Sequence, residues 1–311
     1  LPFFAMGSLP PALSEKMLSL GSKAVERYGV GLIGIVAFNA AVEAHMDQVL
    51  AQKAPFALIA GGTPSQVNRL EASGTRTYLH TPSTGMLDNA IAGGCSRFIF
   101  EGSEAGGHVG SLGSLVLWEM GLERLKNQPD EILSGQSVVF AGGIGTASAS
   151  HFISGIASIL AKVGTRVGLQ VGSSYLFSKE IVNTGAITKV YQEVVCRSEK
   201  TLLMGSTVGL QSRTVSTPFS KKMITSEYRR MREGMPLTER KSAFEKENIG
   251  ALLIGAKAFC PDFDKISAGE KEVCFMNFDE KEQYDRGNFM VGDALSFEDK
   301  AITVADIHQR F

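Results

Sequence analysis

The stretch Phe98-Ile-Phe-Glu-Gly-Ser-Glu-Ala-Gly-Gly-His-Val-Gly110 is the most informative part of this 311-residue chain. Its apolar start is typical of a buried strand, and the glycine-rich loop after it contains two ionisable residues, Glu104 and His108. Glycine lets backbone N–H groups approach a ligand closely, and the helical pattern that follows offers an N-terminus to an anionic or carbonyl-rich ligand. Histidine transfers protons near neutral pH. We therefore interpret residues 101–110 as part of an active site rather than as a solvent-facing turn.

Short apolar runs of this kind alternate with longer amphipathic patterns over residues 1–195. Strands are predicted at residues 2–6, 30–36, 56–60, 76–80, 97–100, 137–141 and 166–171. Helices are predicted at residues 14–28, 41–53, 66–73, 85–92, 115–125 and 147–162. The alternation is typical of βαβ units, in which loops at the carboxyl ends of parallel strands carry the chemistry. Seven strands fit an open doubly wound sheet about as well as a closed barrel, which has eight.

The alternation stops near residue 195. Charged helices are predicted at residues 227–234 and 237–259, irregular structure around residues 262–283 and a last helix at residues 303–311. We therefore expect a barrel-type α/β domain at residues 1–195 and a helical appendage packed on it at residues 196–311. The chain opens inside an apolar run without an initiating methionine, and we expect it to be a piece of a longer protein.

Composition limits the classes of function that this chain can have. Hydrophobic residues make up 44% of the chain and charged residues 20%, and the formal net charge is −1. Electrostatics therefore gives no reason to expect nucleic acid or an anionic membrane as a partner. No apolar stretch is long enough to span a bilayer. The four cysteines form no CxxC pair and no metal-ligand spacing, and we expect reduced thiols in a cytoplasmic protein.

Two further glycine motifs follow the last two predicted strands. They are Ala141-Gly-Gly-Ile-Gly145 and Gly168-Leu-Gln-Val-Gly-Ser-Ser174. In a (β/α)8 barrel these strand ends commonly bind a phosphate group through backbone N–H groups, and Ser173 and Ser174 add hydroxyl donors. Each motif is common alone, but their place on consecutive strands predicts a phosphate site.

Other chemically capable residues have simpler interpretations. His80 ends a predicted strand, where a role in a pocket and a structural role are about equally compatible with the sequence. Cys196 is more readily a buried thiol than a nucleophile. The basic residues between Lys221 and Arg232 are most simply a solvated helix face, although they could also dock a carrier protein with an acidic surface.

Three linked motifs resemble those of a known family. Residues 98–110 are similar to the signature of the nitronate monooxygenase (2-nitropropane dioxygenase-like) flavoproteins, and residues 138–144 and 168–176 resemble its two phosphate-binding strand ends in order and spacing. Glu101 stands where these enzymes usually have Gln. That change and the tail at residues 287–292 resemble the branch found in polyketide and polyunsaturated-fatty-acid synthases, which includes enoyl reductases.

The resemblance implies a TIM (β/α)8-type barrel that holds FMN across its carboxyl-terminal mouth, with His108 as the catalytic acid/base. The cofactor-binding residues that it implies are Glu101, Gly102, Glu104, Gly106, Gly107, Ala141, Gly142, Gly143, Gln170, Gly172 and Ser173. The chain departs from the family in two places. The family's first strand would precede residue 1, which accounts for a barrel that lacks one strand, and Gly31 stands where the family usually has Asn.

Three functions follow from these features. The first is reduction of enoyl thioesters, carried by an acyl carrier protein or free as small molecules, with NADPH or NADH as reductant and other synthase domains as partners. The second is oxidation of alkyl nitronates with O2. The third is a non-catalytic barrel or docking module of a megasynthase. Glu101 and the synthase-like tail favour the first.

Overall fold

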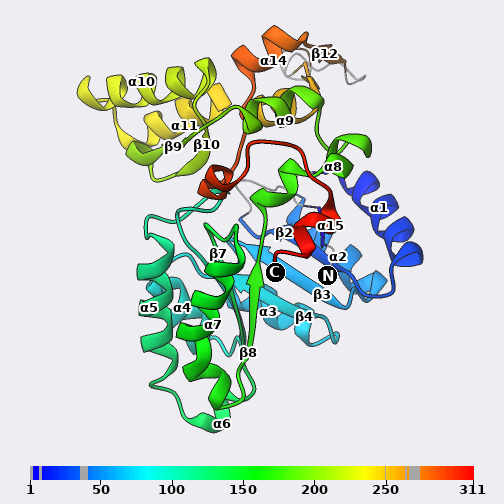
Figure 1. Ribbon diagram of the computed structural model, residues 1–311, viewed down its shortest axis with the longest axis vertical. Helices are drawn as coiled ribbons and strands as arrows, with labels where there is room; N and C mark the ends of the chain where they lie inside the picture. Colours follow the sequence, from blue (N-terminus) through cyan, green and yellow to red (C-terminus); the bar gives the residue numbers. More distant parts are fainter. Residues whose placement is uncertain (1–2, 7–8, 36–40, 249, 263–264, 266–273) are drawn as a thin grey trace. The chain divides into compact units, whose positions relative to one another are not determined.

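The main sheet of the protein contains seven strands in parallel succession (Figure 1). The computed structural model describes residues 3–6, 9–35, 41–248, 250–262, 265 and 274–311. The strands, in their order across the sheet, are β1 (Phe3–Ala5), β2 (Gly29–Ile33), β3 (Phe56–Ala60), β4 (Arg76–His80), β5 (Arg97–Glu101), β7 (Ser137–Ala141) and β8 (Arg166–Gln170). The predicted strands therefore match the observed ones to within a few residues at their ends, and the predicted end residues Pro2 and Val36 lie outside the described part.

The order of the strands across the sheet decides between the two fold classes. Each strand lies beside the next one along the chain, whereas a doubly wound sheet reverses its strand order at a switch point. The helices between the strands are α1 (Pro11–Ala24), α2 (Val42–Gln52), α3 (Pro64–Glu71), α4 (Thr84–Ala92), α5 (Ser114–Leu125), α6 (Asp130–Leu133) and α7 (Ala147–Lys162). The prediction of a TIM-type barrel that lacks one strand is confirmed.

Local sequence signals set where these helices begin. Thr63 caps α3 by accepting a hydrogen bond from the N–H of Gln66, and Pro64 fills the first helical position, where no N–H is needed. Ser83 caps α4 in the same way through the N–H of Met86. Because each cap follows a strand directly, the chain turns from strand to helix over a few residues.

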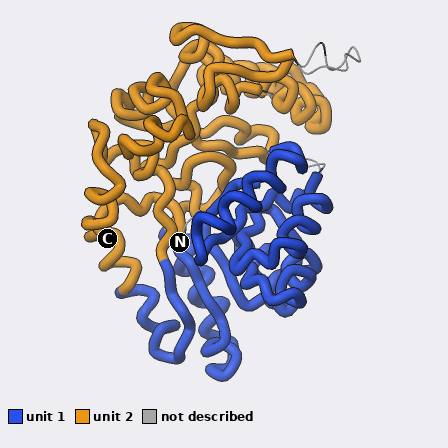
Figure 2. Tube along the Cα trace, turned by 90° about the vertical axis from the view of Figure 1, so that its right-hand side faces the viewer, with its two compact units in different colours: residues 1–101, 115–140, 155–168 blue, residues 102–114, 141–154, 169–311 orange. Residues whose placement is uncertain are grey.

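The chain folds into two compact units that interleave along the sequence (Figure 2). Unit 1 comprises residues 1–101, 115–140 and 155–168, and unit 2 comprises residues 102–114, 141–154 and 169–311. Most of the sheet belongs to unit 1, whereas the loops after β5, β7 and β8 belong to unit 2. The expected boundary after residue 195 stays a prediction, because the two compact units are divided at other positions.

The core of unit 1 is aromatic where α5 packs on the sheet. Phe98, Phe100 and Phe140 are fully buried. The rings of Phe100 and Phe140 meet edge to face at 5.8 Å, and the indole N–H of Trp118 donates to the carbonyl of Phe100 at 3.1 Å. A Cβ at Gly121 would lie 2.6 Å from the Phe100 ring, so a glycine is required for this close approach of helix and strand.

Unit 2 contains strands that the sequence analysis did not predict. Its elements are β6 (Gly107–His108), α8 (Lys179–Asn183), α9 (Lys189–Cys196), β9 (Thr201–Met204), β10 (Ser212–Val215), α10 (Pro218–Arg232), α11 (Leu237–Asn248), α12 (Ala251–Lys257), β11 (Phe259–Pro261), β12 (Phe275–Asn277), α14 (Glu280–Arg286) and α15 (Val304–His308), with short 3-10 turns η1 (Ser173–Phe177), η2 (Ser206–Val208) and η3 (Asp293–Phe297). One antiparallel sheet has the order β6-β10-β9, and β11 pairs with β12. The strands are too short to give a periodic sequence signal.

The region expected to be irregular, around residues 262–283, lies partly outside the described residues. Its described end contains β12 and the start of α14, which Asp279 caps. Within the described ranges, no helix is both long and apolar enough to cross a membrane.

Candidate functional site

The loop after β5 contains most of the predicted site residues and has a defined conformation. The N–H of Gly102 donates to the carbonyl of Ala141 at 3.1 Å, and the N–H of Ser103 donates to the carbonyl of Leu112 at 2.8 Å. Gly107 and His108 form β6, in which His108 is paired with Ser212 of β10. The backbone of His108 is therefore fixed by strand pairing, while the residue is exposed to solvent. Its role as acid/base stays a prediction.

Glu104 has a structural task that the sequence did not indicate. Its Oε2 accepts hydrogen bonds from the backbone N–H of Ser114 at 2.7 Å and from the Ser114 hydroxyl at 2.6 Å. A carboxylate is favoured at the first turn of a helix, where backbone N–H groups lack partners. The carboxylate of Glu104 thus closes the loop onto the start of α5, and the predicted cofactor contact of Glu104 stays untested.

The loop after β7 has the backbone of an anion site. Gly142 and Gly143 have φ values of +105° and +72°, which glycine adopts without strain. A Cβ at Gly142 would lie 2.5 Å from the Ser114 hydroxyl. Among the described residues, the backbone N–H groups of Gly143, Ile144 and Gly145 donate to no acceptor. Successive unpaired N–H groups of this kind suit a phosphate oxygen.

The loop after β8 adds a second open stretch of backbone. Gly172 is exposed, and a Cβ there would meet nothing within 4 Å. In the described part of the chain, the N–H groups of Gly172 and Ser173 also have no acceptor. The Ser173 hydroxyl accepts from the N–H of Gly292 at 2.7 Å, and Gln170 ends β8 just before this loop. Within unit 2, the residues present after β7 and β8 therefore fit a phosphate group.

A segment near the carboxyl terminus packs on the β5 loop. The N–H of Asp293 donates to the carbonyl of Glu104 at 2.9 Å. Cβ atoms added at Gly106 or Gly292 would lie 2.6 Å from the N of Gly292 and 2.5 Å from the carbonyl oxygen of Glu104, respectively. The backbones of the β5 loop and of the carboxyl-terminal segment can thus approach this closely only because Gly106 and Gly292 have no side chains. The glycines of residues 287–292 were the available signal, but nothing in the sequence tied them to this loop.

Arg213 is the functional-site residue that sequence reasoning missed. Its side chain is 11% exposed, and Nε donates to the carbonyl of Ser103 at 2.5 Å. Its Nη1 donates to Thr201 Oγ1 at 2.6 Å and to Asp293 Oδ1 at 3.0 Å, and the Thr201 hydroxyl also donates to Asp293. This cluster ties β9, β10 and the tail to the first residues of the β5 loop.

Unit 1 places two of the singled-out residues side by side. Nδ1 of His80 lies 2.5 Å from Oε2 of Glu101, at the carboxyl ends of neighbouring strands. Glu101 immediately precedes Gly102, so the pair lies next to the β5 loop along the chain. The sequence left a role in a pocket and a structural role open for His80. In either role, His80 acts together with Glu101.

Two of the simpler interpretations can be compared with the structure. Burial raises the pKa of the Cys196 thiol, and the charges of Asp299 and Glu193 raise it further, which is unfavourable for a nucleophile near neutral pH. The basic residues of α10 were expected to form a solvated face, and only some of them are exposed. Arg230 is buried and forms an ion pair with Glu247, whereas Lys221 and Lys222 are exposed. Arg230 was therefore wrongly assigned to the solvated face.

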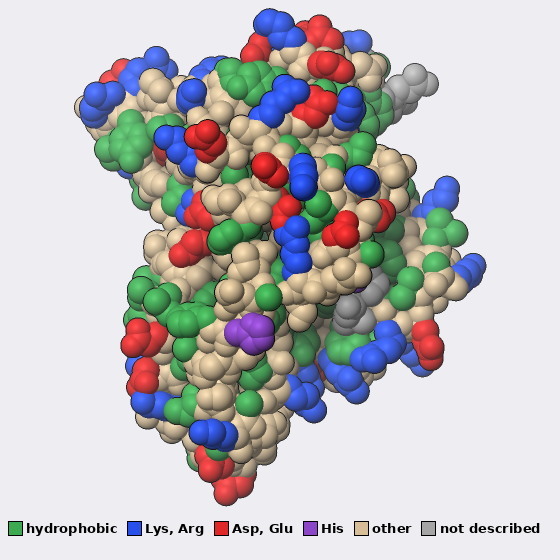
Figure 3. Space-filling view, viewed as in Figure 1, with side chains coloured by type: hydrophobic (Ala, Val, Ile, Leu, Met, Phe, Trp, Pro, Cys, Tyr) green, Lys and Arg blue, Asp and Glu red, His purple; other side chains and the backbone are tan. Residues whose placement is uncertain are grey.

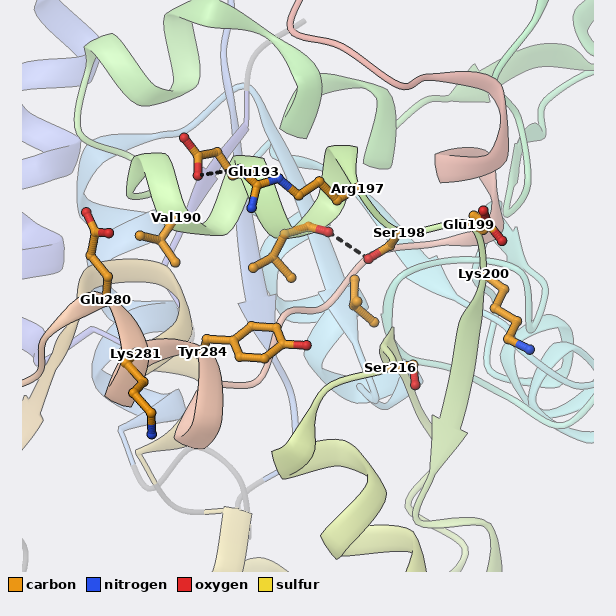
Figure 4. Close-up of a pocket in the computed structure, with 12 residues that line it drawn as sticks. Val190, Glu193, Arg197, Ser198, Glu199, Lys200, Ser216, Glu280, Lys281 and Tyr284 are labelled. Atoms are coloured by element: carbon orange, nitrogen blue, oxygen red, sulfur yellow. Dashed lines mark hydrogen bonds and ion pairs between the residues drawn. The ribbon is translucent and has the colours of Figure 1, made fainter.

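A surface pocket of about 640 Å3 lies elsewhere in unit 2, between α9, β10 and α14 (Figure 4). Arg197 and Lys281, which line it, form exposed ion pairs with Glu193 and Asp285. On the face drawn in Figure 3, acidic and basic side chains are interspersed. Among the described residues, no group of three or more His, Cys, Asp and Glu could hold a metal ion.

Comparisons with known proteins agree with this arrangement. Residues 23–307 match the family described as nitronate monooxygenase. FabK from Thermotoga maritima is 21% identical with a TM-score of 0.68, covering 98% of this chain and 81% of that one. Nitroalkane oxidase from Streptomyces ansochromogenes (TM-score 0.63) and the enoyl reductase domain of MlnA from Bacillus amyloliquefaciens (TM-score 0.60) are each 14% identical and cover 99% of this chain and 86% of theirs. No curated protein matches.

Proposed function

The chain belongs to the nitronate monooxygenase family of oxidoreductases, and we propose that it is an FMN-dependent reductase of enoyl thioesters that uses NADPH or NADH. One observation carries the cofactor assignment. Backbone N–H groups at residues 143–145 and 172–173 have no acceptor within the described part of unit 2, and the space beside Gly172 is open, because a Cβ there would meet nothing within 4 Å. A phosphate monoester supplies the oxygens that such groups bind.

The residues that would hold FMN follow from this geometry. Gly142, Gly143, Gly172 and Ser173 would bind the phosphate. The N–H of Gly102 is already used, because it donates to the carbonyl of Ala141. Bound FMN would carry a hydride from the nicotinamide to the β-carbon of the thioester. The protein's own contribution is to fix the β5 loop. Arg213 holds its start at Ser103, and Glu104 holds its end at Ser114.

His108 is proposed to contact the thioester end of the substrate. Pairing with Ser212 holds its backbone, and the residue is exposed. An imidazole there can donate a hydrogen bond to the thioester carbonyl, which gains negative charge as hydride reaches the β-carbon.

The identity of residue 101 favours an enoyl thioester over a nitronate. Glu101 stands where the family usually has Gln, and this change resembles the branch of the family that includes enoyl reductases. The likeness in fold to FabK and to the MlnA enoyl reductase domain is compatible with this choice. Carrier-bound thioesters would bring an acidic partner, for which exposed Lys221 and Lys222 on α10 offer opposite charge.

The direct experiment is oxidation of NADPH by FMN-loaded protein in the presence of crotonyl-pantetheine. We expect turnover that requires the thioester and falls at least about 100-fold in His108→Gln, in line with the loss of a positioned catalytic group. Gln309→Ala, a change at the exposed end of α15, is the control and should keep wild-type turnover. Flavin-loaded protein without thioester-dependent turnover would contradict the proposal.

Oxidation of alkyl nitronates is the second candidate, favoured by the likeness in fold to a nitroalkane oxidase. It requires no nicotinamide, so oxygen uptake with propyl-2-nitronate separates the two activities. Glu101→Gln sharpens the comparison. If the charge of Glu101 sets the preference, this variant should gain nitronate oxidation relative to enoyl reduction.

A further inference from the structure

The solvent side of α10 carries positive charge that the fold does not use. Residues three, four and seven apart share one face of a helix. Six exposed residues of α10 follow this spacing and form its basic face: Lys221, Lys222, Thr225, Tyr228, Arg229 and Arg232. Within the described residues, none of these four cations forms an ion pair with an acidic side chain. In Figure 3, Lys and Arg side chains gather over α10.

The opposite side of α10 is fixed by buried contacts. Met223 packs in a buried apolar cluster with Phe244 of α11. Glu227, the one acidic residue within α10, is 1% exposed and accepts hydrogen bonds from the N–H groups of Gly205 and Thr207 at 3.1 and 3.3 Å. The acid that could neutralise the basic face is therefore turned away from solvent and used by the fold.

This arrangement of charge is unfavourable for the protein on its own. The chain as a whole has a formal net charge of −1, so the positive charge is a local feature. Like charges one turn apart, such as Arg229 and Arg232, repel each other. The first turn of α10 has no acidic residue, although the helix dipole favours one there, and Lys221 follows that turn directly. An acidic surface laid against the basic face would remove this repulsion, so the face is suited to a partner of opposite charge.

The surroundings of the basic face discriminate between classes of acidic partner. A helix that lies on a membrane needs a free apolar side, but the apolar side of α10 is covered by its own cluster. A nucleic acid needs an extended basic track, whereas this face is about 16 Å long, from Lys221 to Arg232, and acidic side chains are interspersed on the rest of the face drawn in Figure 3. One acidic helix of a protein matches that length. The ring of Tyr228, which is 44% exposed, offers the aromatic contact that protein interfaces use.

The basic face begins close, along the chain, to the residue proposed to contact the substrate. Ser212 of β10 pairs with His108, and only two residues separate β10 from α10. The hydroxyl of Ser220 in the first turn of α10 donates to the carbonyl of Val215, the last residue of β10, at 2.9 Å and fixes this junction. Strand and helix dimensions put Lys221 no more than about 25 Å from Ser212. These elements all belong to unit 2, and a tethered substrate has to dock within reach of its tether.

We propose that the basic face of α10 docks an acidic helix of the carrier that presents the enoyl thioester, an assignment that rests on the proposed function and deepens it. The four cations attract the acidic side chains and raise the rate of encounter, and Tyr228 packs against the partner. Docking there holds the tethered thioester at a high local concentration beside the β6–β10 ladder. A free thioester lacks the carrier and does not use this surface.

The first test compares two substrates that have the same acyl group, crotonyl-pantetheine and the crotonyl thioester of a purified acyl carrier protein. Lys222→Glu/Arg229→Glu should lower kcat/KM for the carrier-bound substrate by about tenfold or more, because electrostatic attraction raises association rates on this scale. Turnover of crotonyl-pantetheine should match the wild type. The matched control is Lys16→Glu/Lys23→Glu, which reverses two exposed lysines at the same spacing on α1 and should leave both substrates unaffected.

Salt gives a second measure of the same contact. Rising ionic strength should lower the wild-type kcat/KM for the carrier-bound substrate, because exposed charges are screened, and the α10 double variant should be less sensitive. An α10 variant that handles the carrier-bound substrate like the wild type would overturn the docking surface. An equal loss for both substrates would also overturn it, because the substitutions would then act on the site and not on docking.

Binding without turnover separates this proposal from the proposed function. Fluorescence anisotropy of the labelled carrier should show binding to the wild type, weakened about tenfold or more in the α10 variant and unchanged in the α1 variant. If the wild type reduces no enoyl thioester, the proposed function fails and the docking surface is judged by this binding alone. Turnover of crotonyl-pantetheine by protein that binds no carrier, or that binds phosphatidylserine vesicles or an oligonucleotide as tightly as the carrier, contradicts the docking surface and leaves the proposed function intact.

Discussion

Unit 1 is assembled largely from neighbours in the sequence, whereas unit 2 joins segments that lie far apart in it. In unit 1, β2, β3 and β4 pair in succession, each with the next strand of the chain. In unit 2, the β5 loop is bonded to Arg213 and Asp293, which are 110 and about 190 residues further along. The scaffold is therefore encoded locally, while the conformation of the site loops depends on distant partners.

This difference separates stability from cofactor binding. A change in the core of unit 1 removes packing that every strand shares, so it should act on unfolding. A change in the contacts of unit 2 alters how loops are held, so it should act on FMN affinity more than on unfolding. The changes below test this division, in order of decreasing expected effect.

Phe100→Ala should have the largest effect. It removes a fully buried ring that packs on Phe140, and truncation of such a ring costs about 3–5 kcal/mol. Urea unfolding measures the loss. Phe152→Ala, at an exposed position on α7, is the control and should change stability by less than about 0.5 kcal/mol. Equal losses for both would mean that this aromatic cluster is not the core.

Gly142→Ala should lower both stability and FMN affinity. An alanine there is strained at φ +105° and places Cβ 2.5 Å from the Ser114 hydroxyl, which together cost about 2–4 kcal/mol. Melting temperature and a fluorescence titration with FMN measure the two effects. Gly155→Ala in α7 is the control and should stabilise the helix by about 0.5–1 kcal/mol.

Gly172→Ala sharpens the same point. Its Cβ would meet nothing in the protein within 4 Å, so stability should be unchanged. FMN affinity should fall, because the added methyl group would occupy space proposed for the phosphate. Unchanged affinity would show that the phosphate lies elsewhere.

Arg213→Lys should weaken FMN binding with a smaller loss of stability. Lysine cannot reproduce the bonds of the guanidinium to Ser103, Thr201 and Asp293 together, and loss of a charged hydrogen bond costs about 1.5–3 kcal/mol. Arg197→Lys is the control, because its ion pair with Glu193 is solvent-exposed and contributes little. If both variants bind FMN like the wild type, the tail does not shape the site.

The smallest effect concerns the thiols. Burial and, to a smaller extent, the nearby charge of Glu71 raise the pKa of Cys95 to about 11, so the reactive thiolate is scarce below that pH. Alkylation by iodoacetamide at pH 8 should be roughly 100-fold slower than for a free cysteine and should rise as pH approaches the raised pKa. Mass spectrometry of tryptic peptides measures it. Rapid alkylation of folded protein at pH 8 would contradict the burial of Cys95.

The same difference explains how far the sequence could be interpreted. Apolar runs such as residues 56–60 and 137–141 predict their strands, because a buried parallel strand is apolar on both faces. Strand order was the missing information that separated a barrel from a doubly wound sheet, since order is set by pairing and not by any one run. Gly142 has a backbone, at φ +105°, that requires glycine, whereas the backbone and packing at Gly172 would accept another residue.

Contacts between distant polar side chains could not be predicted in this way. Arg213 lies in a four-residue strand without periodicity, and nothing near it in the sequence points to Ser103. Glu104 was recognised as an ionisable residue of the loop, but its hydrogen bonds to Ser114 depend on the three-dimensional turn. His80 could be placed at a strand end, whereas its pairing with Glu101 required knowing that β4 and β5 are neighbours.

The central claim is that the loops after β7 and β8 bind the phosphate of FMN. It is tested most directly by comparing the affinities of the purified protein for FMN and riboflavin, which differ only in that phosphate, by fluorescence titration. At about 1.5–3 kcal/mol for each hydrogen bond to a charged group, two bonds from the five open N–H groups are enough for FMN to bind at least about 100-fold more tightly, and Gly172→Ala should remove most of this difference. Equal affinities for the two flavins, or no binding of either, would contradict the account.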